Sequence, residues 1–282
     1  MDQLKKEWPL RTLLMPLASS SKRELATGSS RPDFSLRLEK LMTTKNLNEK
    51  KIIQVKNVSG CTNFGGLEMV GNKMYTIKTR SDNQLSVISE YPDYRKTKRT
   101  NHKYASCMNH GNDMAYHAGY LYVAPCDKFI ERVSVKDWSH KRLSCNIFLS
   151  GIAHWSENQF IGLSSSSGPQ YTLALLEPRG SIMTVLTTWK VNNPKHSEGF
   201  SVSQGLGVKK SNKRIFVVFT NQDFHRNVIL RSAIYNSEVD YILNSKSSSG
   251  KYELEGISFR PDGYKIIGSN LPDGQDATFL AK

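Results

Sequence analysis

The sequence has no long apolar run and no extended segment with a helical period. None of its apolar stretches approaches the roughly 18 residues that span a bilayer, so we expect no transmembrane segment. No stretch of useful length has the 3.6-residue period of an amphipathic helix. With 38% hydrophobic and 23% charged residues, the 282-residue chain has the composition of a folded protein. These features favour an all-β domain.

Several catalytic and metal-binding motifs are also missing. The chain contains no Gly-x-Ser-x-Gly string, no HExxH and no glycine-rich phosphate loop, so serine hydrolysis from a nucleophile elbow has no support. No CxxC pair joins any of the four cysteines, Cys61, Cys107, Cys126 and Cys145, which argues against zinc-ribbon and thioredoxin-like classes. A Cys107–Cys126 disulfide and a set of free thiols both remain open.

Positive charge is in excess. The 39 Lys and Arg against 25 Asp and Glu give a formal net charge of +14, which attracts polyanions such as nucleic acid, anionic lipid or cell-wall teichoic acid. The densest basic segment, Arg95–Arg99, is typical of a solvated loop. No helix-turn-helix, zinc-finger or ribonucleoprotein-type aromatic motif accompanies it, so we expect no specific nucleic-acid recognition.

The first 50 residues differ from the rest and are predicted to form a basic, partly flexible N-terminal extension. A charged start, the short apolar segment Leu13–Ala18 and three serines resemble a degraded secretion signal. Pro16 interrupts that apolar segment, and a flexible basic tail explains the same composition. We expect a secreted or cell-surface protein, with a cytoplasmic location still open.

A hairpin unit occurs five times from Cys61 onward. Its copies begin at residues 66, 113, 151, 205 and 256, which lie between 38 and 54 residues apart. In each, a short apolar strand turns through Gly, Asn or Asp, residues that tolerate positive φ, into a second apolar strand. This is the repeat length of a four-stranded propeller blade.

The repeats predict a monomeric five-bladed β-propeller over residues 51–282, with a β-sandwich carrying insertions as the alternative. The ring would be closed by the strand near Lys51–Lys56 or by the segment Asp276–Leu280. In either case the first strand of each copy would line the central channel.

Two repeat positions would fall at one end of that channel. The first holds mostly polar residues: Gly65, Asn112, Ser150, Gln204 and Glu255. The second holds glycine in four copies and a carboxylate in one: Gly66, Asp113, Gly151, Gly205 and Gly256. Glycine lets backbones crowd at the narrow axis, so Asp113 is the exception.

These positions, together with nearby histidines, define the candidate site. His110, Asp113 and Glu255 are the candidate catalytic groups, with His110 as a general base beside an orienting carboxylate. The candidate ligand-binding residues are Asn112, Ser150, Gln204 and His196. A calcium ion would take its oxygen ligands from Asn112, Asp113, Gln204 and Glu255. Alternatively, such polar groups hold water and satisfy strand-end backbone atoms.

Three short segments carry a family resemblance: His110–Met114, Lys195–Glu198 and Glu253–Ile257. In them the chain resembles bacterial secreted or phage-associated five-bladed propellers similar to the bacteriocin helveticin J. The resemblance covers about residues 60 to 275 and implies a secreted, envelope-directed protein. Together with the basic charge, it predicts binding of an anionic cell-wall polymer or carbohydrate at the channel mouth.

Two other functional classes remain open. One is a metal-dependent propeller enzyme, such as a lactonase-like hydrolase or a lyase, that uses His110, Asp113 and Glu255. The other is a scaffold or protein-interaction module. Bound metal and turnover would distinguish the enzyme from both binding hypotheses.

Overall fold

The computed structural model describes residues 50–164, 168–223, 226–232, 237–244, 253–271 and 276–281. Apart from two short 3₁₀ turns, η2 (His196–Glu198) and η3 (Lys210–Asn212), every element in these ranges is a β-strand. The all-β prediction is therefore confirmed. The predicted secretion signal and most of the N-terminal extension lie outside the described residues.

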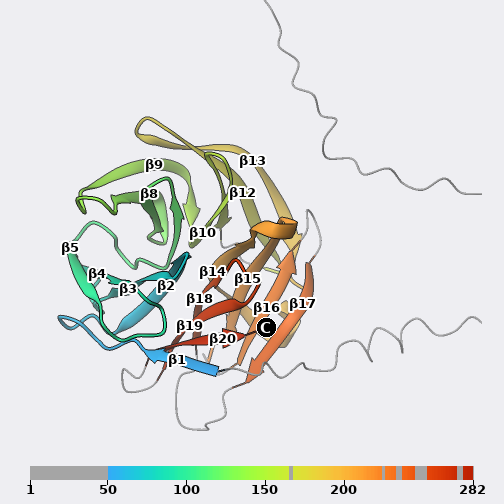
Figure 1. Cartoon of the computed structure of the whole chain (residues 1–282). Helices are drawn as coiled ribbons and strands as arrows, with labels where there is room; N and C mark the ends of the chain where they lie inside the picture. Colours follow the sequence, from blue (N-terminus) through green and yellow to red (C-terminus); the bar gives the residue numbers. More distant parts are fainter. Residues whose placement is uncertain are drawn as a thin grey trace, which may run out of the picture. The chain divides into compact units, whose positions relative to one another are not determined.

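The strands form antiparallel meanders that follow one another along the chain (Figure 1). The first contains β2 (Asn63–Val70), β3 (Lys73–Thr79), β4 (Leu85–Tyr91) and β5 (Thr100–Ala105). The second contains β6 (Asp113–His117), β7 (Tyr120–Ala124), β8 (Asp127–Ser134) and β9 (His140–Leu149). The third contains β10 (Gly151–Ser156), β11 (Gln159–Ser164), β12 (Gln170–Arg179) and β13 (Ile182–Asn192). The fourth contains β14 (Phe200–Lys209), β15 (Arg214–Asn221), β16 (Arg226–Ser232) and β17 (Ser237–Asn244).

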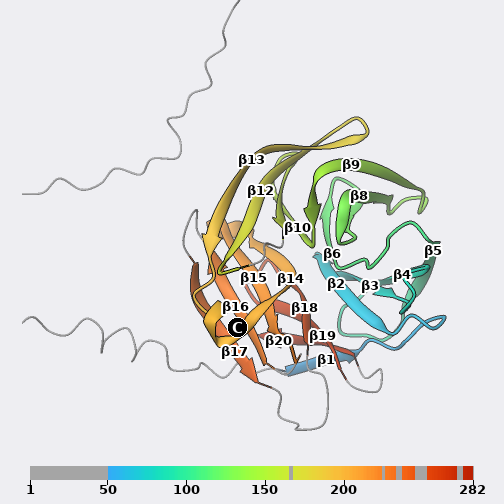
Figure 2. The same cartoon turned by 180° about the vertical axis from the view of Figure 1, so that it is seen from behind.

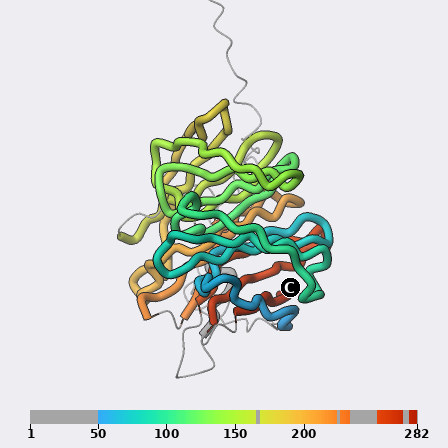
Figure 3. The backbone as a smooth tube through the Cα atoms, turned by 90° about the vertical axis from the view of Figure 1, so that its left-hand side faces the viewer, coloured from blue at the N-terminus to red at the C-terminus, as the bar shows by residue number. Residues whose placement is uncertain are grey.

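The last sheet joins the two ends of the described chain. It contains β18 (Glu253–Phe259), β19 (Lys265–Asn270), β20 (Ala277–Ala281) and, at its outer edge, β1 (Lys50–Gln54). β1 pairs antiparallel with β20, so that Lys50 lies opposite Leu280. Figure 3 shows this blue strand beside the red strands of the C-terminal sheet. The two segments that the sequence offered as alternatives, Lys51–Lys56 and Asp276–Leu280, therefore contribute neighbouring strands to the same sheet.

Tight turns form where the repeat predicted them. Gly71, between β2 and β3, has φ of 62°, and Gly119, between β6 and β7, has φ of 85°. Both values lie in the left-handed region that glycine enters without a steric penalty. The turn after β10 places Glu157 at φ of 46°. Local turn chemistry therefore sets the hairpin positions.

The first strand of each sheet faces a common centre. β2, β6, β10, β14 and β18 each contact the next, and β18 contacts β2. Figures 1 and 2 show these strands inside and the fourth strands β5, β9, β13 and β17 toward the periphery. The backbones approach closely there: a Cβ added at Gly205 would lie 2.4 Å from the Glu255 carbonyl oxygen. The prediction that the repeated glycines allow crowding at the axis is thus confirmed.

Apolar side chains fill the spaces between neighbouring sheets. One cluster joins the third and fourth sheets, with Leu173 and Phe219 among its buried members. Another joins the second and third sheets around Phe160 and Leu143. The last sheet packs on the first through Ile266. The second and third sheets also meet at one edge by a single parallel pair, in which Ile182 of β13 lies opposite Ser144 of β9, so these eight strands form a continuous sheet.

The four cysteines are free thiols, so Cys107 and Cys126 are not joined. Among the residues the structure describes, no helix is long and apolar enough to cross a membrane.

Candidate functional site

The structure brings three of the predicted ligand-binding residues together at the end of the channel where the innermost strands begin. The Asn112 amide nitrogen donates to the carbonyl oxygens of Ser150, at 2.6 Å, and Gln204, at 2.5 Å. All three residues are buried. The Ser150 hydroxyl also lies 3.2 Å from the hydroxyl of Ser203. Asn112 therefore links the third and fourth sheets through their backbones.

Asp113 is fully buried on the axis, and its carboxylate accepts backbone hydrogen bonds. Oδ2 accepts from the N–H of Ile152 and from that of Leu206, both at 3.0 Å. Oδ1 accepts from the N–H of Met114 at 2.9 Å. Burial raises the pKa of Asp113 well above its usual range, and these three donors oppose that rise. One side chain thus binds the start of β10 and the second half of β14 to β6.

The absent side chain of Gly66 makes room for this carboxylate. A Cβ added at Gly66 would lie 2.9 Å from Asp113 Oδ1 and 2.8 Å from its Cα. Asp113 is therefore the single acid in a position where glycine elsewhere keeps the axis open, as the repeat alignment predicted. The groups that hydrogen-bond to its carboxylate are backbone N–H donors.

Glu255 belongs to a buried carboxyl pair with Glu253. Its Oε1 accepts from Asn270 Nδ2 at 3.5 Å, and its Oε2 has no hydrogen-bond partner among the described residues. The Gln204 side chain donates to Glu253. Burial, followed by the neighbouring Glu253, raises the pKa of Glu255 well above its usual range.

His110 reaches this pair only through two amides. Asn63 Nδ2 lies 3.3 Å from His110 Nε2, and Asn63 Oδ1 accepts from Asn270 Nδ2 at 3.0 Å. Burial lowers the pKa of His110, which favours the neutral imidazole. Among the described residues, neither Asp113 nor Glu255 hydrogen-bonds to it. The predicted base and its orienting carboxylates are thus neighbours without direct contact.

The predicted calcium ligands are mostly engaged with one another or with the backbone. Asp113 accepts from three N–H groups, and the amide nitrogens of Asn112 and Gln204 face acceptors. Calcium takes six to eight oxygen ligands and would have to compete with these donors for Asp113. Calcium binding here stays a prediction.

His196, the remaining predicted ligand residue, lies apart from this group. It stands in η2, between β13 and β14, and lines a cavity of about 10 Å³ with Asn193, Ser203 and Phe219. Such a volume suits no more than a single water molecule.

A larger pocket opens at the opposite end of the channel, where the innermost strands finish. Its volume is about 420 Å³, and all five innermost strands contribute to its wall. The residues that carry its polar and charged groups are Glu68, Tyr116, His154, Lys209, Lys210, Ser211, Ser258 and Arg260. We call this space the basal pocket.

Glu68 is the carboxyl group of the basal pocket. Its Oε2 accepts from the Ser258 hydroxyl at 2.9 Å, and its Oε1 lies 3.4 Å from the Tyr116 backbone nitrogen. Ser258 itself accepts from the Met69 N–H at 3.1 Å. Burial raises the pKa of Glu68 to about 7, against the lowering effects of Ser258 and Lys210. Both protonation states of Glu68 are therefore accessible near neutral pH.

The rim of the basal pocket is cationic. Among the described residues, no carboxylate lies at ion-pair distance from Lys209 or Lys210, although Lys210 is near enough to Glu68 to lower its pKa. Arg260 pairs with Asp262 at 2.6 Å. His154 donates from Nε2 to the Glu157 carbonyl at 2.9 Å and stacks on His117. Burial is the main cause that lowers the pKa of His154 to about 4, so its ring is neutral.

Sequence reasoning missed Glu68, although the repeat contains a signal for it. Two residues after the glycine position, the five copies hold Glu68, Ala115, Ala153, Gly207 and Ser258. These positions face the channel, and three of them hold small apolar residues, one a serine and one a glutamate. Such a set indicates open space beside a single acid. The two repeat positions that predicted a site from the sequence lie at the other end of the channel.

Comparisons with known proteins show the fold alone. No family model and no curated protein matches the chain. The structure is similar to that of a glutaminyl cyclase from Myxococcus xanthus, with a TM-score of 0.56 and 12% identity over 83% of this chain and 95% of that one. A weaker match is the β-propeller domain of Cps50 (Swd1) from Myceliophteria thermophila, with a TM-score of 0.47 and 6% identity over 83% and 99% of the two chains.

Proposed function

We propose that residues 51–282 form a five-bladed β-propeller that binds an anionic, hydroxyl-rich ligand in the basal pocket, such as a teichoic-acid-type polymer of the bacterial envelope. The protein is a binding protein in this proposal. It keeps the ligand class that the family resemblance and the basic charge together implied, and it moves the site from the strand beginnings to the strand ends.

The single observation that carries the proposal is the basal pocket, at about 420 Å³. Ligand sites generally occupy roughly 300 to 1,000 Å³, with a few polar groups placed in an apolar wall. Here Leu206, Val208 and Ile257 supply apolar wall and Glu68 with Ser258 supplies the polar floor. Space and convergent polar groups thus coincide.

Charge at the rim favours an anion. Lys209 and Lys210 line the pocket, and a net charge of +14 would raise the local concentration of a polyanion. Phosphate or carboxylate groups of a ligand would pair with these ammonium groups.

The floor favours hydroxyl groups. A carboxyl with a pKa of about 7 both donates and accepts near neutral pH, and Ser258 adds a hydroxyl beside it. Paired donors and acceptors suit sugar or polyol hydroxyls. A phosphate with attached hydroxyls therefore fits both the rim and the floor.

The channel end at Asn112 offers less. There, the side chains of Asn112 and Asp113 already form hydrogen bonds with neighbouring backbone groups. Binding at that end would first have to break these contacts, each worth about 1 kcal/mol or more.

The test is calorimetric binding of purified poly(glycerol phosphate) teichoic acid to the full chain and to the double variant Lys209→Gln/Lys210→Gln. We expect Kd to rise roughly tenfold or more, because one charge-assisted hydrogen bond contributes about 1.5–3 kcal/mol. Affinity of the unmodified chain should also weaken as salt screens the rim.

The matched control is Lys98→Gln/Lys103→Gln, which removes the same charge from exposed positions in the β4–β5 loop and in β5. It should bind like the unmodified chain. If both double variants lost the same affinity, the effect would come from net charge and not from the basal pocket. If the unmodified chain did not bind teichoic acid, this ligand class would be rejected.

A further inference from the structure

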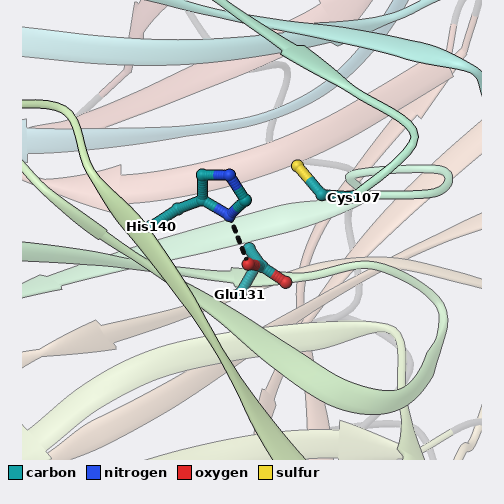
Figure 4. Close-up of side chains that lie close together, drawn as sticks. All are labelled: Cys107, Glu131 and His140. Atoms are coloured by element: carbon teal, nitrogen blue, oxygen red, sulfur yellow. Dashed lines mark hydrogen bonds and ion pairs between the residues drawn. The ribbon is translucent and has the colours of Figure 1, made fainter.

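Three potential metal ligands from separate segments lie together on the second sheet. The Sγ of Cys107, a carboxylate oxygen of Glu131 and a ring nitrogen of His140 all lie within 4.8 Å of one another. In Figure 4 the thiol of Cys107 and the ring of His140 point toward one another beside the Glu131 carboxylate. No contact assigned to either end of the channel uses this group.

Strand pairing brings two of these residues together. In the β8–β9 ladder, Glu131 lies opposite Arg142 and Val133 lies opposite His140. Glu131 and His140 are thus diagonal neighbours, and side chains two positions along a strand share one face. Cys107 comes from the segment between β5 and β6, which lies over that face.

We propose that Cys107, Glu131 and His140 bind a zinc-type divalent transition metal. Thiolate, imidazole and carboxylate are the three ligand types that zinc takes in proteins, and three of them leave a fourth tetrahedral position for water. Their mixture of soft and borderline donors does not suit calcium or magnesium. On binding, the Cys107 thiol releases its proton to solvent as the metal–sulfur bond forms. The hydrogen bond between His140 Nδ1 and Glu131 Oε1 is replaced by two metal bonds, and the neutral imidazole then carries its proton on Nε2.

The geometry requires a small adjustment at His140. Its Nδ1 lies 2.7 Å from Glu131 Oε1, whereas two light-atom ligands of a tetrahedral zinc stand about 3.3 Å apart, given bonds of about 2.0 Å. The His140 side chain is 43% exposed, so its ring has room to turn by the few tenths of an ångström needed.

Arg142 orients the carboxylate without occupying the oxygen that a metal needs. Its Nε lies 3.4 Å from Glu131 Oε2, and its Nη2 donates to the Cys107 carbonyl at 3.1 Å. The guanidinium rests over the Phe129 ring, 3.7 Å from its centroid. Oε1 stays directed at His140, as in other sites where a second partner fixes a ligating carboxylate.

A metal here would fasten the segment that leads to the channel. Ser106, Asn109 and Gly111 have φ of 51°, 41° and 53°, so the chain between Cys107 and Asn112 follows a tightly turned path. A metal bond from Cys107 to β8 and β9 would anchor that path beside His110. The proposal is therefore a stabilising metal centre, independent of the basal pocket.

The test is titration of chelator-treated full chain with Co²⁺ and with Zn²⁺. Cobalt should bind at one equivalent with a thiolate-to-metal charge-transfer band in the near ultraviolet, and zinc should displace it and raise the melting temperature. Cys107→Ser should lose the charge-transfer band, and His140→Gln should lower the affinity at least tenfold.

Cys126→Ser and His117→Gln are the matched controls, since both remove a similar group outside the cluster. They should keep the band and the stoichiometry. Absence of a charge-transfer band in the unmodified chain, or an unchanged band in Cys107→Ser, would overturn the proposal. Teichoic-acid binding should be the same with and without metal, which separates this test from that of the basal pocket.

Discussion

Each end of the central channel holds an acidic residue on an innermost strand, but the hydrogen bonds and the free space around the two residues differ. Where the innermost strands begin, Asn112 and Asp113 are buried and bonded to backbone groups. Where those strands end, Glu68 shares a pocket of about 420 Å³ with Ser258 and a cationic rim. The carboxyls of both ends have raised pKa values because of burial.

This difference separates structural from ligand-binding carboxyls. A buried carboxylate costs free energy unless donors surround it, and at Asp113 the chain itself supplies three. Glu68 accepts one hydrogen bond from the Ser258 hydroxyl and a long contact from the Tyr116 N–H, and the basal pocket leaves open volume beside it. A perturbed pKa marks a functional group only where space for a ligand accompanies it.

The largest effect should follow removal of the axial carboxylate. Asp113→Ala leaves the buried N–H groups of Ile152 and Leu206 without their acceptor, and each such loss costs roughly 1–3 kcal/mol. We expect urea unfolding to show a free energy lower by about 3 kcal/mol or more. Asp113→Asn, which keeps one oxygen, should lose less.

Asp223→Ala is the control for this experiment, because Asp223 is exposed and its carboxylate makes a long contact of 3.5 Å with the Asn221 amide nitrogen. Its unfolding free energy should stay close to that of the unmodified chain. If Asp113→Ala were equally stable and only binding were lost, Asp113 would be a ligand-binding group and the contrast between the two ends would disappear.

A smaller effect is expected at Glu255. Its pKa in the folded protein is raised above the ordinary 4.5, so its stabilising contribution is full below about pH 4.5 and is lost as pH rises through the folded value. A glutamine at position 255 does not ionise, so the Glu255→Gln variant should not lose stability in this way as pH rises. The variant should be more stable than the unmodified chain at pH 8, with little difference at pH 4.

Thermal unfolding across that pH range measures the effect. Glu157→Gln, at an exposed hairpin turn, should show no such trend. The sequence-based enzyme hypothesis makes a different prediction, namely that Glu255→Gln folds normally and abolishes turnover. A Glu255→Gln variant that is destabilised at pH 8 would contradict our account of the carboxyl pair.

The smallest effect concerns the pH dependence of binding in the basal pocket. As pH rises through about 7, Glu68 gains a negative charge and should repel an anionic ligand. Affinity for teichoic acid should fall roughly fivefold between pH 6 and pH 8, the size of a charge interaction of about 1 kcal/mol. Glu68→Gln should bind with little pH dependence over this range. If its affinity changed with pH as much as that of the unmodified chain, Glu68 would not belong to the binding site.

Much of the fold was predictable because it depends on local chemistry. The turns at Gly71 and Gly119 and the alternating strands beside them are short-range features. The special position of Asp113 among glycines was also visible from the repeat alone. The role of Asp113 could not be predicted from the sequence, because the Ile152 and Leu206 N–H groups that bind it are 39 and 93 residues away.

The sequence by itself determined the strands, the turns between them and the small residues that let five strands meet at one axis, because those features follow from backbone sterics and residue pattern. Only the tertiary structure decided which polar groups are satisfied and where space remains. It placed Glu68 against Ser258, 190 residues away, and Cys107 beside Glu131 and His140. The physical reason is that hydrogen-bond satisfaction and cavity volume depend on every sheet that reaches a point, and no local pattern records them.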